Sequence, residues 1–454
     1  MAVVPFAIST SQARNNKGNN EELINMYANI APATAKSQIV LQGTPGWGLY
    51  VTLPTYPILA THYFLGSLYC VTPSNVYSVD PQGSVVNLGN VSWSDDYVSI
   101  ADNGLQMVMT SGNSYYYEKS SGTFAKITDP NYYLSDSVTF QDGYFIFNRS
   151  ATGQFFLSRL YAVTFDGTMF ATAEGSPDNL AAVISDHQHL WLMGTNSIEV
   201  WYNSGDALFP FARIMGSFQY RGCINKRTIS IINNTLFWVG DDSIVYQANG
   251  YTPVRISTAA IEYPLGINDP QHFRAFTYVE EGHAFYVLTI DGVSTFAYDI
   301  MTQLWHTRSS LGGTWGLRGI IADQIGNNFG CDIANGNLYK VGLDYYTENG
   351  QTILRTAMTS PFSNGVDFFT LSKFELDMET GKSQPNLEDT ITLSFSDDGG
   401  VTFNNDHTIS LGAMGQRKKR VVWRRLGRHR NLTLRVTTRA NSQTNIIAAH
   451  AELT

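Results

Sequence analysis

A short pattern recurs about every 45 residues through the first three-quarters of this 454-residue chain. Each unit is an apolar run, a turn and a second run that ends near an aromatic residue. A single hairpin of this kind is not stable alone in water, so the units must stack on their neighbours. A spacing of about 40–50 residues is typical of propeller blades, which predicts an all-β fold with a β-propeller. The units lie at 64–80, 104–118, 142–158, 189–203, 235–250 and 283–299, and a truncated copy lies at 335–346.

The composition favours a packed globular chain over disorder, because 43% of the residues are hydrophobic and only 15% are charged. The cysteines Cys70, Cys223 and Cys331 are too few and too far apart for a disulfide framework or a zinc site, so we expect buried packing residues. No apolar stretch reaches the roughly 20 residues of a bilayer span, and the first residues lack a signal-peptide pattern. We therefore expect assembly in a reducing cytoplasm and no membrane insertion of its own.

The predicted propeller occupies 46–350. A ring with a gap would expose a sheet edge, so its last blade must join its first. We expect strands near 336–346 to pair with strands near 48–64 and to complete one blade between them. Six blades is the best count, with seven as the alternative.

The two ends of the chain do not follow the hairpin repeat. Residues 1–45 are predicted to form an N-terminal arm, in which the polar run 11–22 is not packed and the apolar run 23–31 docks on another surface. Residues 351–454 alternate apolar and polar side chains, as in FELDM at 374–378. This period of two is typical of a sheet with one dry face and predicts a separate β-sandwich.

One turn in the predicted sandwich has a known pattern. SDDGGVTF at 396–403 fits the Asp box, S-x-D-x-G-x-T-F/W, and is similar to the hairpin turns of sialidase-like propellers. There Asp398 would accept bonds from turn amides, and Gly400 would adopt a positive φ. A sialidase also needs an arginine cluster and a Tyr/Glu nucleophile pair, and no local signature identifies such a set. We expect a structural role for this turn.

The chain has no motif that predicts catalysis. H-E-x-x-H, G-x-S-x-G and the P-loop are all missing from the sequence. His187 and His189 lie two apart on a predicted strand and would share a face, but no third ligand follows at an informative spacing. We expect no catalytic residue, no metal ligand and no cofactor. Acidic doublets beside predicted turns are expected to aid solubility: Asp95–Asp96, Asp241–Asp242 and Glu280–Glu281.

Charge is distributed unevenly along the chain. The net charge is −9, and removing the eight Lys and Arg residues of 417–430 leaves −17. Apolar residues interleaved in this basic segment predict a strand pair with a turn at Gly427. The basic side chains are Arg417, Lys418, Lys419, Arg420, Arg424, Arg425, Arg428 and Arg430.

Two interpretations of the basic segment 417–430 remain open. Long basic side chains can coat a sheet edge and prevent aggregation. Alternatively, the segment is an interface, either with nucleic-acid phosphates or with an acidic neighbouring subunit.

Motifs in all three parts of the chain carry a family resemblance. The central ones are S-P-D-N-L, H-L-W-L-x-G, E-V-W-Y-N-S-G and P-F-x-R within 174–223, and N-G-Y-T-P-x-R-I-S-T within 234–258. I-N-M-Y and G-T-P-G precede them, and S-D-D-G-G-x-T and V-x-W-R-R-L-G follow. In this order they resemble the packaged-DNA-stabilisation proteins of short-tailed bacteriophages, the tail hub or tail nozzle family. One departure is Ala28, where the family tends to have proline after I-N-M-Y.

The resemblance implies a structural protein of the virion tail with no catalytic activity. Members of the family form a homo-hexameric ring below the portal and the head-to-tail adaptor ring. The ring retains packaged DNA, extends the channel through which double-stranded DNA transiently passes, carries tailspikes or tail fibres, and is closed by a tail needle or plug. In that setting we expect the basic segment to bind an acidic partner, since strong phosphate contacts would slow ejection.

Two other functions remain as alternatives. A glycan-binding or glycan-cleaving propeller would stack sugars on its Tyr- and Trp-rich loops, although scattered aromatics in propellers are more often core residues. A generic propeller scaffold is the other. The repeats here lack the Trp-Asp ending that is common in such scaffolds.

Overall fold

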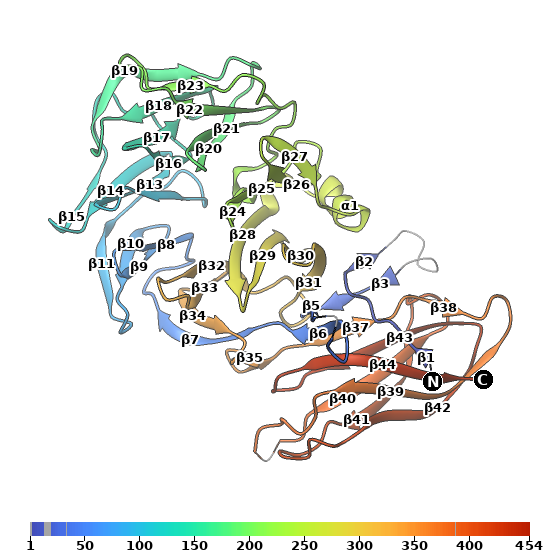
Figure 1. The fold of residues 1–454 in the computed structure, drawn as a ribbon. Coiled ribbons are helices and arrows are strands. Elements are labelled where there is room, and N and C mark those ends of the chain that lie inside the picture. The colour runs from blue at the N-terminus through green and yellow to red at the C-terminus, as the bar shows by residue number, and fades with distance from the viewer. Residues whose placement is uncertain (1, 13–19, 33, 386) are drawn as a thin grey trace.

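The computed structural model describes residues 2–12, 20–32, 34–385 and 387–454. Their regular structure is almost entirely β-strand, and seven groups of four antiparallel strands stand around one axis as the blades of a propeller (Figure 1). Blades 1 to 3 are β8 (Ala60–Phe64), β9 (Ser67–Val71), β10 (Asn75–Val79) and β11 (Val85–Asn90); β12 (Ser99–Asp102), β13 (Gln106–Ser111), β14 (Asn113–Glu118) and β15 (Thr123–Lys126); and β16 (Val138–Gln141), β17 (Tyr144–Asn148), β18 (Gln154–Ser158) and β19 (Phe165–Thr172).

The next three blades follow without interruption, and each again pairs its strands in chain order. Blades 4 to 6 are β20 (Leu180–Asp186), β21 (His189–Gly194), β22 (Ile198–Asn203) and β23 (Phe211–Arg213); β24 (Ser230–Ile232), β25 (Thr235–Val239), β26 (Val245–Asn249) and β27 (Thr252–Arg255); and β28 (Phe273–Glu280), β29 (His283–Ile290), β30 (Ser294–Asp299) and β31 (Leu304–Arg308). The helical segments between blades are η1 (Lys226–Thr228), α1 (Ala259–Ile267) and η2 (Pro270–His272).

Blade 7 closes the ring with strands from both ends of the repeat region. Three strands are consecutive, and the fourth is β7, which runs antiparallel to β34. The predicted closing pair is therefore confirmed, but the count of six blades is wrong by one. The fragment at 335–346 contains only β34 and belongs to a blade of its own, which β32, β33 and β7 complete. These strands are β32 (Leu317–Ala322), β33 (Asn328–Asp332), β34 (Asn337–Gly342) and β7 (Gly46–Thr52).

Buried apolar clusters join adjacent blades at all seven boundaries of the described ring. At the closure, Leu68 and Cys70 of blade 1 pack with Phe329 and Cys331 of blade 7. All three cysteines are free and buried, as the sequence predicts. Burial raises the pKa of the Cys223 thiol to about 12, so this thiol is a neutral packing group. Each large apolar side chain buried in this way stabilises the ring by about 1.5–3 kcal/mol.

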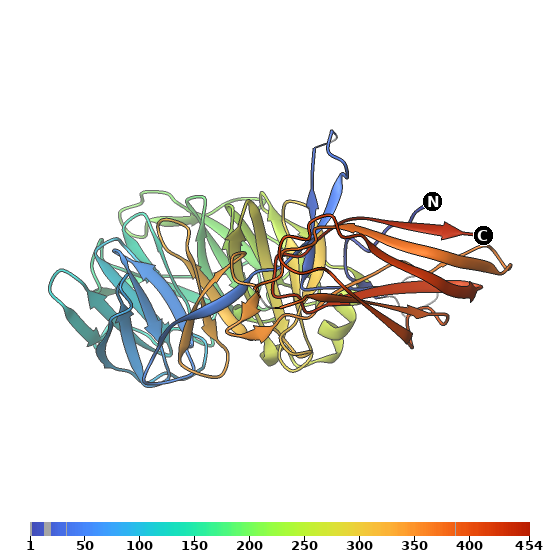
Figure 2. The same ribbon diagram turned by 90° about the horizontal axis from the view of Figure 1, so that it is seen from below.

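The C-terminal sandwich lies beside the propeller disc, which Figure 2 shows edge-on. One sheet has the order β42-β39-β44-β6-β5, with β1 on β44, and the other has the order β4-β37-β43-β40-β41, with β38 on β43. The C-terminal strands are β37 (Arg355–Met358), β38 (Phe362–Ser363), β39 (Phe369–Met378), β40 (Thr390–Ser396), β41 (Asn404–Ser410), β42 (Val421–His429), β43 (Asn431–Thr438) and β44 (Asn445–Leu453). The two-residue strands β35 (Thr347–Glu348) and β36 (Gln351–Thr352) precede them.

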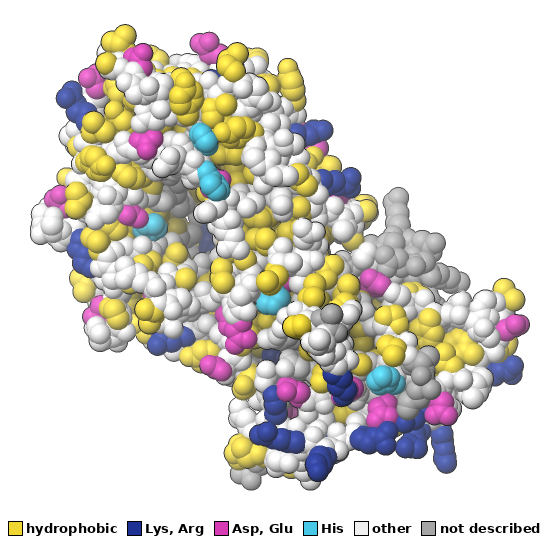
Figure 3. Space-filling model, viewed as in Figure 1, with side chains coloured by type: hydrophobic (Ala, Val, Ile, Leu, Met, Phe, Trp, Pro, Cys, Tyr) yellow, Lys and Arg dark blue, Asp and Glu magenta, His cyan; other side chains and the backbone are white. Residues whose placement is uncertain are grey.

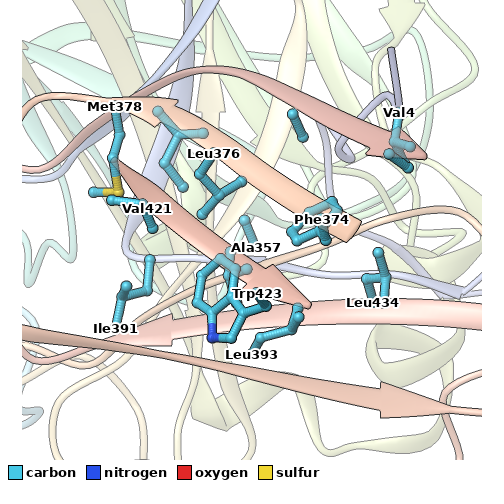
Figure 4. Packing of buried hydrophobic residues seen from close by; sticks show 14 of the residues in the cluster. Val4, Ala357, Phe374, Leu376, Met378, Ile391, Leu393, Val421, Trp423 and Leu434 are labelled. Carbon is cyan, nitrogen blue, oxygen red and sulfur yellow. The ribbon is translucent and has the colours of Figure 1, made fainter. Parts of the chain in front are cut away.

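The sandwich core confirms the predicted alternation. Phe374 and Leu376 of β39 point inward with Trp423 of β42, and they meet Leu393 of β40 and Leu434 of β43 from the facing sheet (Figure 4). All five side chains are buried. The indole N–H of Trp423 donates to the carbonyl oxygen of His407 at 2.7 Å, so the one polar atom of this ring is also satisfied.

The described part of segment 1–45 is woven into the sheets and is not a free arm. β1 (Ala2–Val3) and β6 (Ile39–Gly43) pair with β44, β5 (Met26–Ile30) pairs with β6, and β4 (Leu23–Ile24) lies between β31 and β37. A continuous sheet therefore runs from blade 6 through β4 into the sandwich. Arms of this kind are hard to predict, because β1, β4 and β6 pair with strands hundreds of residues away.

The polar run 11–22 is packed at both of its described ends, contrary to the prediction. β2 (Ser11–Gln12) pairs with β3 (Asn20–Glu21), and the side chain of Asn20 is buried. Its amide donates to the carbonyl oxygen of Gly399 at 3.0 Å. The central part of this prediction, 13–19, lies outside the described residues.

A buried polar centre joins the propeller to the sandwich. Asn25, at φ 52°, donates through Nδ2 to the carbonyl oxygens of Ser309 and Leu354, both at 2.8 Å, and accepts from the Ser309 N–H at 3.0 Å. The guanidinium of Arg308 lies 3.9 Å from the ring centre of Trp315, and burial raises the pKa of the nearby Glu348 to about 7. Asn25, which lies between β4 and β5, thus forms hydrogen bonds with both the propeller and the sandwich.

Candidate interaction surface

The basic segment 417–430 forms one border of the sandwich. Within it, β42 is the edge strand of its sheet and pairs only with β39 among the described strands. This placement differs from the predicted strand pair with a turn at Gly427, because β42 continues through Gly427 to His429. The inward residues Val421, Trp423 and Leu426 are buried in the core, which leaves the basic side chains outside.

A β-bulge changes how β42 presents these side chains. The register with β39 shifts between Leu371 and Lys373, so that two residues of β42 face one residue of β39. Arg425 takes φ 60°, and Gly427 takes φ 108°. A positive φ is costly for arginine, by about 1 kcal/mol, and bulges are common where a strand re-aims a side chain. Here the bulge exposes Arg424 and Arg425 in succession.

Two members of the segment are paired within the chain. Arg420 donates to Glu375 of β39 through Nε and Nη2, both at 2.7 Å. These bonds, together with Lys373, hold the pKa of Glu375 at about 2. Lys419 donates to Ser410 at 2.7 Å and lies 3.7 Å from Glu388. Both cations therefore bind other residues of the sandwich itself.

The other six cations form no ion pair with a described carboxylate: Arg417, Lys418, Arg424, Arg425, Arg428 and Arg430. All six are exposed. Arg428 and Arg430 stack on the half-exposed ring of Phe368, with centroid distances of 4.6 and 4.4 Å. Figure 3 shows Lys and Arg side chains gathered on the lower border of the sandwich, with acidic side chains scattered over the propeller. We call these six residues the basic edge.

The Asp box lies between β40 and β41, on the same body. Asp398 accepts from the N–H groups of Val401 and Thr402 at 2.9 and 3.0 Å and from the Thr402 hydroxyl at 2.6 Å. Gly400 takes φ 86°, and its N–H donates to Ser396. The hydrogen bonds from Ser396 and Thr402 hold the pKa of Asp398 well below its usual range. This geometry organises a turn.

Ion pairs cross the axis of the propeller, and they involve two acids that were expected only to aid solubility. Asp95 and Asp96, before blade 2, pair with Arg227, which lies in η1 before blade 5. Asp96 also accepts from Arg318 of blade 7 at 3.0 Å, and Lys226 lies 3.5 Å from both Asp95 and Asp136. The doublet Asp95–Asp96 is therefore structural. No local signal predicts this, because the partners come from opposite blades.

The described residues hold no group of three His, Cys, Asp or Glu side chains that is arranged to bind a metal. His187 takes φ 49° in the turn between β20 and β21 and pairs with Asp186 at 3.0 Å, while His189 begins β21 beside Tyr251. The strand that was expected to hold both histidines thus holds only one. No helix in the described part of the chain has the length and apolar character needed to cross a bilayer.

The fold and its surfaces define a class of protein. A propeller ring is joined through a shared sheet to a sandwich, which gives one body with wide loop faces. Two family models match almost the whole chain: "Bacteriophage P22 Gp10, beta-propeller" over residues 12–341 and "Bacteriophage P22 Gp10, beta-sandwich" over residues 355–454. The chain belongs to the bacteriophage P22 Gp10 family, the tail hub and DNA-stabilisation proteins of phage virions.

Other comparisons add less. No curated protein sequence matches the chain. Among solved structures, the designed protein Ika8 is 12% identical with a TM-score of 0.41, covering 71% of this chain and 99% of its own. The extracellular domain of BT4673 from B. thetaiotaomicron is 11% identical with a TM-score of 0.44, covering 74% of this chain and 44% of its own. BamB from Moraxella catarrhalis is 10% identical with a TM-score of 0.39, covering 67% and 98%.

Proposed function

We propose that six copies of this chain form a ring in the phage tail, below the portal and the adaptor ring. The ring retains the packaged genome, extends the channel through which double-stranded DNA leaves, and carries tailspikes or tail fibres around a central needle or plug. The protein is assembled in the host cytoplasm and performs no catalysis. The propeller (46–350) and the sandwich (351–454) serve as its two building blocks.

The observation that carries this proposal is the match of both domains, in order, to a single tail-protein family. The structure adds physical support. Asn25 and the shared sheet fix the sandwich against the propeller, as a subunit that withstands DNA pressure requires. The ion pairs across the propeller axis also favour a DNA path between subunits rather than through a single propeller.

The basic edge is proposed to bind an acidic protein surface. Its six cations have no carboxylate partner among the described residues of their own chain, so they are free to pair in an assembly. Interfacial charge pairs in such a place set partner choice and orientation. Tight phosphate contacts would instead oppose the sliding of DNA during ejection.

Electron microscopy of the purified particle tests the ring directly. We expect six copies of the propeller and sandwich immediately below the adaptor ring. A different location or copy number would contradict the proposal. Replacing Arg424, Arg425 and Arg428 with Ser tests the basic edge, and we expect particle assembly to be lost. Normal assembly with altered DNA release would assign the edge to DNA.

A further inference from the structure

The two faces of the propeller can be separated by topology. In every blade the turn from first to second strand lies on one face, because antiparallel strands reverse direction at each turn. The turns from third to fourth strand lie on the same face in blades 1 to 6, and in blade 7 the end of β34 and the start of β7 lie there. The turns from second to third strand and the connections between blades lie on the other. We call the first the hairpin face and the second the connection face.

Several charges on the connection face are paired within the chain. Besides the pairs across the axis, Arg221 lies 3.2 Å from Asp242, and Arg255 binds Glu262 at 2.6 Å. Arg274 binds Asp291 at 2.7 Å. Other carboxylates of this face form no ion pair with a described residue, and of these Glu174 and Asp269 are exposed, whereas Asp129, Asp178 and Asp332 are half-buried.

The hairpin face differs in degree, because more of its exposed carboxylates lack a cationic partner. Seven of them form no ion pair with a described residue: Asp80, Glu118, Asp142, Asp206, Glu281, Asp323 and Asp344. Several accept only from their own turns, as Asp206 does from the Leu208 N–H at 2.8 Å and Asp323 from the Ile325 N–H at 3.0 Å. The cations nearby are engaged: Arg159 pairs with Asp166, and Lys119 donates to the carbonyl oxygen of Leu65.

We propose that the hairpin face of one copy receives the basic edge of the next copy, a contact that rests on the ring proposed above. Six unpartnered cations on one body match seven unpartnered carboxylates on another body of the same chain. The two surfaces differ, so the contact is head-to-tail, and a pair of copies still has one free surface of each kind. A head-to-tail contact of this kind closes into a ring when its rotation allows.

Paired charge reversals test this contact. One variant reverses the edge (Arg424→Glu, Arg428→Glu, Arg430→Glu), and another reverses the face (Asp206→Lys, Glu281→Lys, Asp344→Lys). All six residues are exposed, so both variants should fold. Each alone places like charges opposite one another, and we expect self-association to weaken about tenfold or more in sedimentation velocity. The control is charge reversal of Lys126 and Arg439, which are exposed outside the basic edge and the hairpin face. This control should leave self-association unchanged.

The decisive measurement is the mixture of the two variants. The negative edge of the first then meets the positive face of the second, and the positive edge of the second meets the negative face of the first. Association should return in the mixture, and also in a chain that carries both sets. Association of each variant at the wild-type level, or no gain on mixing, would overturn the proposal.

The same experiment distinguishes this contact from the ring itself. If microscopy finds the chain in its tail position but mixing restores nothing, the ring stands and the basic edge binds another molecule. Retention of a DNA duplex by the wild-type chain, lost in the edge variant, would identify that molecule as nucleic acid. A chain absent from the tail removes the ring whatever the mixing shows.

Discussion

Arg227 pairs with Asp95 across the axis of the propeller, although they lie 132 residues apart in the chain. Arg227 also bonds Asp96, so a single guanidinium holds both acids of the doublet. Arg318 reaches the same doublet from blade 7. Three blades are thus tied across the axis by charge, in addition to the apolar clusters at their boundaries.

We expect Arg227→Gln to lower the free energy of unfolding by about 1–3 kcal/mol, because it leaves two neighbouring carboxylates without their shared cation. Urea denaturation followed by tryptophan fluorescence measures this. The control is Arg159→Gln, which removes an exposed pair to Asp166 with a separation of 3.5 Å and should cost about 0–0.5 kcal/mol. Equal effects of the two changes would show that the contact across the axis adds nothing.

Glu348 gives the junction a pH dependence. Burial raises its pKa to about 7, against the opposing effect of Arg308 and Arg355. The folded protein therefore holds this proton more tightly than the unfolded chain does. Its contribution to stability is complete below pH 4.5 and is lost as the pH rises to about 7.

We expect Glu348→Gln to remove that loss. The difference in urea midpoint between the variant and the wild type should then change between pH 5 and 7 and stay constant above about pH 8. Parallel titration curves for the two proteins would show that Glu348 titrates normally in the folded state.

Local patterns predicted most of the architecture. The period of the hairpins and the alternation around Phe374 depend on neighbours in sequence, and both are present in the structure. The number of blades did not follow, because the hairpin of β32 and β33 was not identified as a repeat unit. The strands of segment 1–45 were missed because β1, β4 and β6 pair with strands hundreds of residues away.

The surface features were likewise predicted only where they depend on residues close in sequence. Composition alone indicated that 417–430 is exposed and basic, but the bulge at Arg425 has no sequence signature, since arginine rarely takes a positive φ. Asp95 and Asp96 look like a solvated turn until Arg227 is placed opposite them. The charge of the hairpin face could not be predicted before each turn was assigned to a face.

The contribution of the Asp box to stability should depend on pH in the acidic range. Hydrogen bonds hold the pKa of Asp398 well below its usual range, so its contribution is present above about pH 4 and is lost as the pH falls. We expect the melting temperature of the wild type to fall more steeply between pH 4 and 2 than that of Asp398→Asn. Asp367→Asn, at an exposed site, should follow the wild type. Identical slopes for all three proteins would contradict this role.

Asn25 should decide whether the propeller and the sandwich unfold as one unit. Asn25→Ala removes three hydrogen bonds to Ser309 and Leu354 and places alanine at φ 52°. We expect a loss of about 2–4 kcal/mol and, in calorimetry, two transitions in place of one.

Asn25→Gly separates the two causes, because glycine accepts the positive φ but supplies no side-chain bonds. If the bonds couple the bodies, the glycine variant also shows two transitions. Asn29→Ala, which removes only a 3.2 Å bond to Gln42 within the same sheet, should keep a single transition. One transition in all variants would mean that the shared sheet through β4 suffices to couple the propeller to the sandwich.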